Sequence, residues 1–144
     1  MRSLPGLMLA FTQLAAASGI SPIGTWRTID DETHKPRALV SIEEHDGALT
    51  GRIVQLFREP GEDPQPLCID CPGESHNQPV LGMTILWNFH QHGDSWTGGE
   101  VLDPEEGRIY RATLRVLDAG QQLELHGYVG VPLFGRSQVW ERVE

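Results

Sequence analysis

From Gly24 onward, hydrophobic and polar residues alternate with a period of two along most of the chain. In residues 108–117 the residues Tyr110, Ala112, Leu114 and Val116 alternate with arginine and threonine. Alternation of this kind is typical of a half-buried β-strand, because successive side chains point to opposite faces of a sheet. The pattern predicts eight strands, at residues 24–29, 37–45, 48–57, 80–90, 95–102, 108–117, 121–129 and 134–143.

Turn-forming residues separate these strands. Asp46-Gly47 is a strong signal for a type I′ hairpin turn, because both central residues of that turn need positive φ. Gly98-Gly99 predicts a bulge or a sharp bend inside the fifth strand. Residues 58–78 are rich in proline and glycine and are too long for a hairpin connection, so we expect a functional or lid-like loop between strands three and four.

Eight strands without a long helix have two edges to hide, and pairing the first strand with the last removes both. We therefore expect an all-β fold, an eight-stranded up-and-down antiparallel barrel in which the strand ending in Trp140 and Arg142 pairs with the strand containing Trp26. A flat sheet or an open sandwich is the structural alternative. A barrel of this size has room for its own side chains and one small ligand.

The length and net charge of the chain limit the number of domains and the classes of partner to be considered. A chain of 144 residues is the size of a single domain. Its formal net charge of −9 and its scattered arginines disfavour binding along a phosphate backbone, so no nucleic-acid partner is expected.

The N-terminus has the pattern of a secretory signal peptide. Residues 1–17 have Arg2 as their one charge, an apolar run over residues 7–14 and three alanines before Ser18. Cleavage after Ala17 would leave residues 18–144 as a single barrel domain that is periplasmic or secreted. A short N-terminal helix that stays on the protein is the alternative. No later apolar run has the length of about 20 residues that a spanning helix needs, so we expect no transmembrane segment after cleavage.

Two cysteines, Cys68 and Cys71, lie in the long loop and allow three interpretations. A redox-active dithiol would need a helix after the first cysteine, and none is indicated. A zinc site would need two further ligands, for which only dispersed histidines are candidates. A local disulfide fits an oxidising compartment, and it would add little global stability because it closes a short loop.

The sequence contains no recognisable catalytic constellation. Its six histidines are dispersed, and there is no Gly-x-Ser-x-Gly nucleophile elbow. Glu100 would point inward if Gly98-Gly99 keeps the strand register, where burial would raise its pKa, and outward if a bulge intervenes. We therefore expect no enzyme activity, no cofactor and no metal.

A small apolar or amphipathic ligand is the expected partner. The candidate ligand-binding residues are Trp87, Phe89, Tyr110, Phe134 and Arg136. Arg136 shares a strand face with aromatic residues, as polar groups do in ligand pockets. The alternative for that face is a wet outer surface, with Val139 and Val143 in the core.

Two other functions stay open at this point. The first is an envelope interaction or structural protein with a filled barrel, acting through residues 58–78 and exposed aromatics such as Tyr128. The second is an enzyme acting at the barrel mouth.

Five spaced motifs resemble one bacterial exported family, the domain of unknown function 2147. The motifs are Gly24-x-Trp26 with Asp30-Asp31; Cys68-x-x-Cys71-x-Gly73-Glu74; Pro79-x-x-Gly82; Gly98-Gly99-x-x-x-Asp103-Pro104-x-x-Gly107-x-x-Tyr110; and Gly127-Tyr128-x-Gly130-x-x-x-Phe134-Gly135-Arg136-x-x-x-Trp140-x-Arg142. The resemblance implies an exported protein with a lipocalin-like barrel in a family without an established activity.

Trp26 and Arg142 also resemble the lipocalin signature. That resemblance implies that the arginine stacks on the tryptophan and closes one end of the barrel, a contact worth about 0.5–2 kcal/mol. The alternative is that Trp26 is only a large core residue.

Overall fold

The computed structural model of the protein describes residue 6 and residues 21–133 and 135–144. The expected signal peptide and its cleavage site therefore lie outside the described residues, Gly6 apart. Phe134 lies outside them as well.

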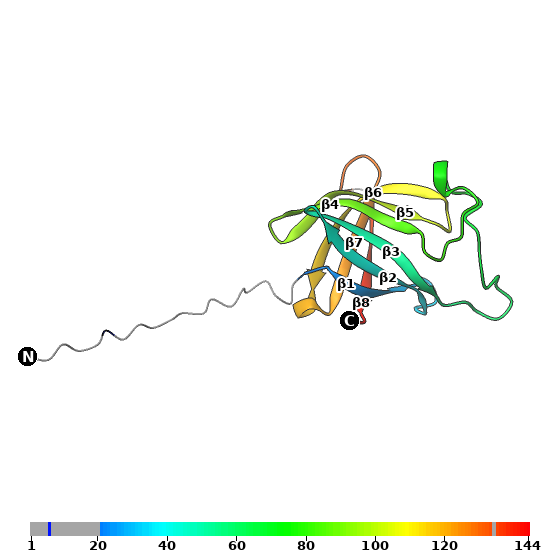
Figure 1. The fold of residues 1–144 in the computed structure, drawn as a ribbon, viewed down its shortest axis with the longest axis horizontal. Helices are drawn as coiled ribbons and strands as arrows, with labels where there is room; N and C mark the ends of the chain where they lie inside the picture. The colour runs from blue at the N-terminus through cyan, green and yellow to red at the C-terminus, as the bar shows by residue number, and fades with distance from the viewer. Residues whose placement is uncertain (1–5, 7–20, 134) are drawn as a thin grey trace, which may run out of the picture.

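The described residues form a closed antiparallel barrel of eight strands, each paired with the next along the chain (Figure 1). The strands are β1 (Gly24–Ile29), β2 (Pro36–His45), β3 (Ala48–Leu56), β4 (Thr84–His92), β5 (Ser95–Asp103), β6 (Arg108–Leu117), β7 (Gln122–Tyr128) and β8 (Gly135–Arg142). The predicted eight-stranded up-and-down barrel is thus confirmed. Two single-turn 3-10 helices, η1 (Gly73–Ser75) and η2 (Asp118–Gly120), interrupt the connections.

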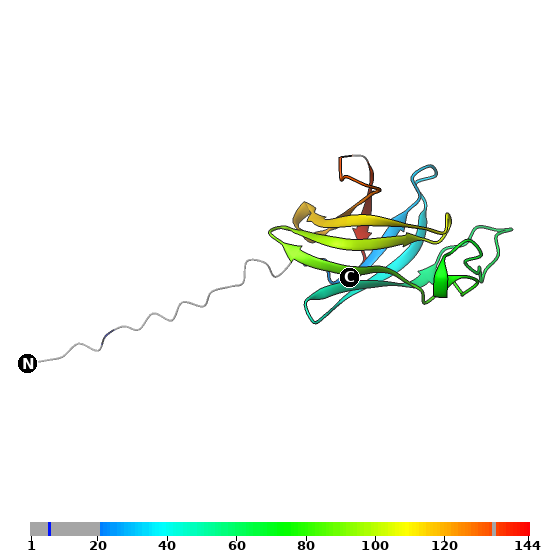
Figure 2. The ribbon, with the colours of Figure 1, turned by 90° about the horizontal axis from the view of Figure 1, so that it is seen from above.

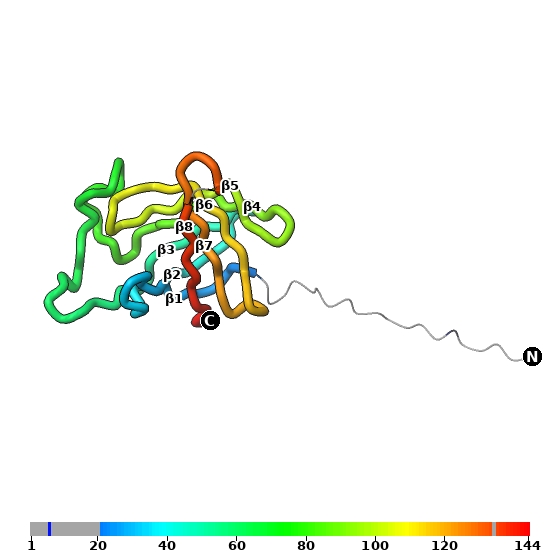
Figure 3. The backbone as a smooth tube through the Cα atoms, turned by 180° about the vertical axis from the view of Figure 1, so that it is seen from behind, coloured from blue at the N-terminus to red at the C-terminus, as the bar shows by residue number. Residues whose placement is uncertain are grey.

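Closure occurs between the first and last strands, as the sequence pattern predicted. Trp26 pairs with Arg142 and Arg27 pairs with Glu141. In Figure 3, β8 in red runs beside β7 and β1.

Within the described part of the chain, no helix has the length and apolar character needed to cross a bilayer.

The up-and-down order gives the barrel two different ends. The connections β1–β2, β3–β4, β5–β6 and β7–β8 lie at one end, which we call the loop end. Figure 2 shows the long green β3–β4 loop beside the yellow β5–β6 turn at that end. The short turns β2–β3, β4–β5 and β6–β7 lie at the other end, which we call the closed end.

Trp26 and Arg142 seal the closed end. The Trp26 ring is fully buried, and the Arg142 guanidinium carbon lies 4.3 Å from the ring centroid. Trp26 Nε1 donates to the carbonyl oxygen of Pro22, and Arg142 donates to the carbonyl oxygens of Ser21, Ile23 and Gly120. The structure therefore contains the stacking contact that the lipocalin resemblance implied.

Large side chains fill the closed half of the barrel because glycines on neighbouring strands make room for them. A Cβ atom at Gly51 would lie 2.8 Å from Leu86, and one at Gly99 would overlap the Phe89 ring. Both Leu86 and Phe89 are fully buried. These side chains occupy the interior of this half.

Strand β4 differs from the sequence expectation in its start and in its faces. It begins at Thr84 rather than at residue 80, because residues 80–83 turn through Gly82 at φ 89° and belong to the long loop. Register shifts between β3 and β4, with Asn88 at φ 64°, place irregular residues inside the strand. Strict alternation fails there.

The irregular β4 separates two aromatic residues, Trp87 and Phe89, that period-two alternation would place on one face. Phe89 points into the core, whereas Trp87 is half-buried and its Nε1 lies 3.3 Å from Glu100 Oε1. Glu100 follows the predicted bulge at Gly98, where φ is 76° and the β5–β6 register shifts. Glu100 therefore pairs with Trp87 on the face opposite to buried Val101.

Candidate functional site

A cavity of about 970 Å³ occupies the loop-end half of the barrel. Its floor is apolar and comes from strands β2 to β5, β7 and β8, through Val40, Ile53, Ile85, Val101, Leu125 and Trp140. Volumes of about 300–1,000 Å³ are typical of small-molecule sites, so the space suffices for a ligand.

The cavity exists because the inner wall changes from large to small residues along the barrel. In the closed half the inward residues include Trp26, Phe89 and Trp96, all buried. In the loop-end half the wall includes Ala38 and Gly127. A Cβ atom at Gly127 would still have ordinary contacts, 3.7 Å to Tyr110 Cβ and 4.0 Å to Val101 Cγ1, so side-chain space is open in front of it.

A network centred on Arg37 joins three connections at the rim of the cavity. Its Nη2 atom lies 2.6 Å from Glu105 Oε1, its Nη1 atom lies 3.5 Å from Glu62 Oε1, and its Nε atom lies 4.0 Å from Asp30 Oδ2. The hydrogen bond to Glu105 is the main reason why the pKa of Arg37 is raised. Glu62 also contacts Arg58 at 3.6 Å. The loops at the rim are therefore held together by charge.

Two rim carboxylates are held ionised chiefly by backbone N–H groups. Asp30 accepts from the N–H groups of Thr33 and Glu32, which lowers the pKa of Asp30. Glu62 accepts from the N–H group of Glu59, which lowers the pKa of Glu62.

The β5–β6 turn carries three further carboxylates, Asp103, Glu105 and Glu106. Asp103 Oδ1 accepts from the N–H groups of Glu105 at 2.9 Å and Glu106 at 3.3 Å. Burial raises the pKa of Asp103 in spite of these hydrogen bonds. The Tyr110 hydroxyl donates to Glu106 Oε2 at 2.6 Å, and this bond raises the pKa of Tyr110.

The charged lining of the cavity is predominantly acidic. Three arginines contribute to it, Arg37, Arg58 and Arg136. Seven carboxylates contribute as well, and these are Asp30, Asp31, Glu32, Glu62, Asp103, Glu105 and Glu106. The excess of carboxylates makes the mouth of the cavity negative.

The structure distributes the five candidate ligand-binding residues over different places. Tyr110 and Arg136 line the cavity. Phe89 is buried in the filled closed half, and Trp87 lies on the opposite face of β4, so neither borders the cavity. Phe134 is outside the described residues. The contact of Tyr110 and Arg136 with a ligand stays a prediction.

Sequence reasoning missed the rim carboxylates and Arg37. These residues lie in turns or at the ends of strands beside turns, where charged side chains are usually solvated and carry no periodic signal. Asp30-Asp31 and Asp103-Pro104 did occur among the spaced motifs, which was the one available signal.

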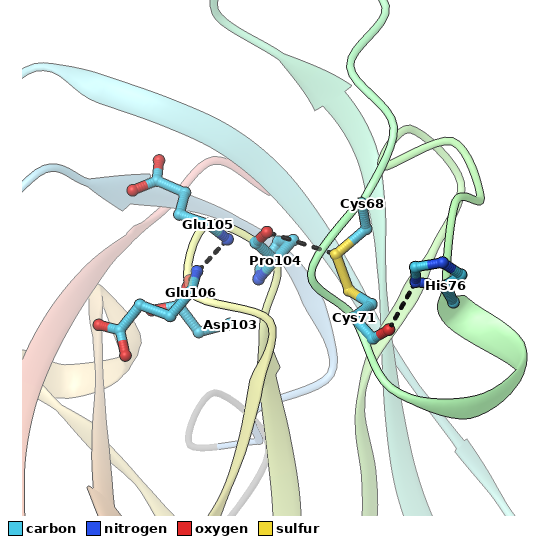
Figure 4. The surroundings of a disulfide bond; sticks show 7 residues. All are labelled: Cys68, Cys71, His76, Asp103, Pro104, Glu105 and Glu106. Atoms are coloured by element: carbon cyan, nitrogen blue, oxygen red, sulfur yellow. Dashed lines mark hydrogen bonds between the residues drawn. A yellow bond between two sulfur atoms is a disulfide. The ribbon is translucent and has the colours of Figure 1, made fainter.

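The disulfide between Cys68 and Cys71 is present, with 5.4 Å between the two Cα atoms, and both residues are buried. Cys68 Sγ lies 3.3 Å from the Pro104 carbonyl oxygen; because a disulfide sulfur carries no hydrogen, this is a packing contact. Figure 4 shows the disulfide on one side of the β5–β6 turn and the side chains of Glu105 and Glu106 extending on the other. The long loop thus supports the turn that carries the carboxylates.

The described residues contain no group of three or more His, Cys, Asp or Glu side chains arranged to hold a metal ion. The single histidine–carboxylate ion pair among them joins His45 and Glu43 at 3.2 Å, and both side chains are largely exposed. This pair does not border the cavity.

Comparisons with known proteins agree with this description. The family of uncharacterized proteins conserved in bacteria, DUF2147, matches residues 24–142. Among solved structures, protein HP1028 from the human pathogen Helicobacter pylori, described as belonging to the lipocalin family, has a TM-score of 0.73 and 19% sequence identity, covering 87% of this chain and 84% of that one. At this identity the likeness shows the lipocalin-like fold alone. No curated protein matches the chain.

Proposed function

This chain belongs to the DUF2147 family of uncharacterized proteins conserved in bacteria, and from that premise we propose that it is an exported protein that binds a small apolar or amphipathic ligand inside its barrel. The observation that carries the proposal is the cavity of about 970 Å³ with an apolar floor. Apolar floors with a few polar groups at the entrance are usual in small-molecule sites.

The contrast between the two halves of the barrel supports binding. The closed half is packed with aromatic and aliphatic side chains, whereas the loop-end half keeps Gly127 and Ala38 on its wall. A barrel that served only as a structural unit would gain stability by filling this space, because burial of each further methylene contributes about 0.8 kcal/mol. The open half is therefore consistent with a requirement for a ligand.

Two features support export. Residues 1–17 have the composition of a signal peptide. The disulfide between Cys68 and Cys71 is of the kind that persists in oxidising compartments such as the periplasm or the extracellular space. A periplasmic or secreted location is part of the proposal.

Binding is tested with a neutral apolar fluorescent probe, N-phenyl-1-naphthylamine, titrated into the purified chain. We expect the emission to rise on binding, because the probe enters an apolar site. The Gly127→Phe variant places a ring in the cavity at a position where a Cβ atom fits, and it should reduce the affinity at least about tenfold.

The matched control is Val139→Phe, which adds the same ring at an exposed position on β8. It should bind the probe as the unchanged chain does. Equal loss in both variants, or no binding by the unchanged chain, contradicts a ligand site in this cavity.

A second function has its own observation. Leu67, Ile69 and Leu81 of the long loop are 50%, 65% and 54% exposed, although all three are apolar. Exposed apolar residues on one segment favour contact with a protein partner in the envelope. Crosslinking in cells, with Ile69→Ser as the comparison, distinguishes this function from ligand binding, because Ile69 does not line the cavity.

A further inference from the structure

We propose that the cavity selects a cationic amphiphile, a molecule with an apolar chain and a protonated amine or quaternary ammonium head group. This inference rests on the proposed function and specifies the ligand that the same site would take. Its basis is the complementarity between the apolar floor and apolar chains, and between the acidic rim and a positive head group.

Two of the three arginines that line the cavity are already paired with carboxylates. Arg37 is already engaged by Glu105, Glu62 and Asp30, and Arg58 is engaged by Glu62. Arg58 also donates through Nε to the carbonyl oxygen of Asp63 at 2.8 Å. These two guanidinium groups are outnumbered by the carboxylates that they contact, so they leave no positive charge for an anionic head group.

Four of the seven carboxylates of the rim have no cationic partner among the described residues. Asp31, Glu32, Asp103 and Glu106 form no ion pair with a Lys or Arg side chain among the described residues. Asp31 accepts from Gln138 Nε2 at 3.2 Å, and Glu106 accepts from the Tyr110 hydroxyl. These bonds come from neutral donors and do not neutralise the carboxylates.

The β5–β6 turn presents three carboxylates at the rim of the cavity. The long loop supports the β5–β6 turn from one side, and the carboxylates of Glu105 and Glu106 extend on the other (Figure 4). Asp103, in the same turn, is partly buried against the cavity. A partly desolvated carboxylate gains more from a nearby cation than a fully hydrated one does.

Arg136 is the feature that would favour the opposite charge. It lines the cavity, and among the described residues its guanidinium forms no ion pair. Arg136 is itself exposed, but seven carboxylates line the same cavity, and the other two arginines of the lining are paired with carboxylates. At a Debye length of about 8 Å these local carboxylates dominate the interaction with a head group, so the rim favours the cation.

Three surfactants that share a dodecyl chain provide the test: dodecyltrimethylammonium, dodecyl maltoside and dodecyl sulfate, all below their micelle concentrations. Each displaces N-phenyl-1-naphthylamine from the full chain, and isothermal titration calorimetry of each surfactant gives a readout independent of the probe. We expect the cation to bind at least about tenfold more tightly than the sulfate, with a gap that narrows as salt is added.

The Asp31→Asn, Glu106→Gln double variant removes two rim charges without changing side-chain size. It should weaken binding of the cation about three- to tenfold and leave the neutral probe unaffected. The matched control, Glu43→Gln with Glu44→Gln, makes the same change in net charge at exposed positions of β2 outside the cavity, and it should leave the affinity for the cation unchanged.

Three outcomes overturn the inference. Equal affinity for all three head groups shows that the rim does not select charge. Tighter binding of the sulfate that is lost in Arg136→Gln shows an anion site. Equal weakening by the rim variant and its control shows an effect of net charge alone. If no surfactant and no probe binds at all, the proposed function itself fails, which is a distinct result.

Discussion

At the scale of single residues, Arg142 combines several interactions at the closed end. Its guanidinium stacks on Trp26 and donates to three backbone carbonyl oxygens, two of which precede β1. Burial lowers the pKa of Arg142, so its charge needs these partners. The planar fork of arginine supplies several donors at once, which a lysine cannot do.

Replacing Arg142 should therefore destabilise the fold. We expect Arg142→Ala to lower the free energy of unfolding by roughly 2–4 kcal/mol, since a stacked cation and charged hydrogen bonds are lost together. The free energy of unfolding of Arg142→Lys should lie between those of the unchanged chain and Arg142→Ala, because lysine keeps the positive charge but lacks the planar guanidinium that donates several hydrogen bonds at once. Urea denaturation followed by tryptophan fluorescence measures both values. An alanine variant as stable as the unchanged chain would show that the Trp26 contact does not contribute.

Asp103 gives a prediction about pH. Because burial raises its pKa in the folded state, its contribution to stability is fully present below the unfolded pKa near 3.8 and is lost as pH rises through the raised folded value. Asp103→Asn keeps the Oδ1 acceptor and removes the charge. This variant should be more stable than the unchanged chain at neutral pH, by about 1 kcal/mol or less because the group is partly solvated.

The gain from Asp103→Asn should disappear below pH 3.8, where both side chains are neutral. Thermal or urea unfolding across this pH range measures the difference. The neighbouring carboxylates Glu105 and Glu106 act in the same direction, so their repulsion strengthens the trend. A gain that stayed constant with pH would point to a cause other than ionisation.

At the scale of elements, the long loop and the β5–β6 turn behave as one unit. The disulfide packs against Pro104, and the backbone of Asp70 lies against Gly107. The turn in turn carries Asp103 and the two following glutamates to the rim. The disulfide closes a loop of only a few residues and therefore adds little to global stability. Its contribution is to fix the conformation of the part of the long loop that packs against Pro104.

Gly107→Ala tests this contact between elements. Gly107 has φ +70°, and a Cβ atom there would overlap the Asp70 carbonyl oxygen, so backbone must move. Gly61, in the long loop, has φ +92°, and a Cβ atom added to it would meet no other atom within 4 Å. Gly61→Ala is therefore the matched control for the cost of positive φ alone.

We expect Gly61→Ala to cost about 1 kcal/mol and Gly107→Ala about 2–4 kcal/mol, because overpacking adds to the conformational cost. Hydrogen exchange should also show faster exchange at residues 66–71 in Gly107→Ala alone. An equal loss in the free energy of unfolding for the two variants would mean that the long loop moves away from the added methyl group without penalty and does not support the turn.

At the scale of the whole molecule, the contacts that stabilise the barrel and the cavity that would bind a ligand lie at opposite ends. The closed end contains the Trp26–Arg142 contact and the packed aromatics, whereas the loop end contains the cavity and its acidic rim. Substitutions at the rim should therefore change binding with little effect on folding, which makes the charge variants interpretable.

Export is also a property of the whole chain. We expect the protein recovered from the periplasm or the medium of an expressing bacterium to begin at Ser18 and to contain 127 residues, which is 144 less the 17 of the signal peptide. Intact-mass spectrometry measures the cleavage site and, from the loss of two hydrogens, the oxidised cysteine pair. Recovery of the uncleaved chain from the cytoplasm would contradict the signal-peptide prediction.

The sequence by itself determined the strands, their order and the closure of the barrel. Period-two alternation and turn residues such as Asp46-Gly47 are local properties, and their conformations follow from steric rules that act over a few residues. The positive φ values of Asp46 and Gly47, 52° and 81°, agree with that local reasoning. Edge pairing then left one economical topology.

Only the tertiary structure decided where the cavity lies and which residues border it. Irregular register in β4 moved Trp87 and Phe89 to different faces, and alternation cannot reveal a register shift because pairing with a neighbouring strand produces it. The acidic rim assembles Asp30, Glu62 and Glu105 from three separate connections around Arg37. Such contacts between distant segments exist only once the barrel has closed, and no local pattern encodes them.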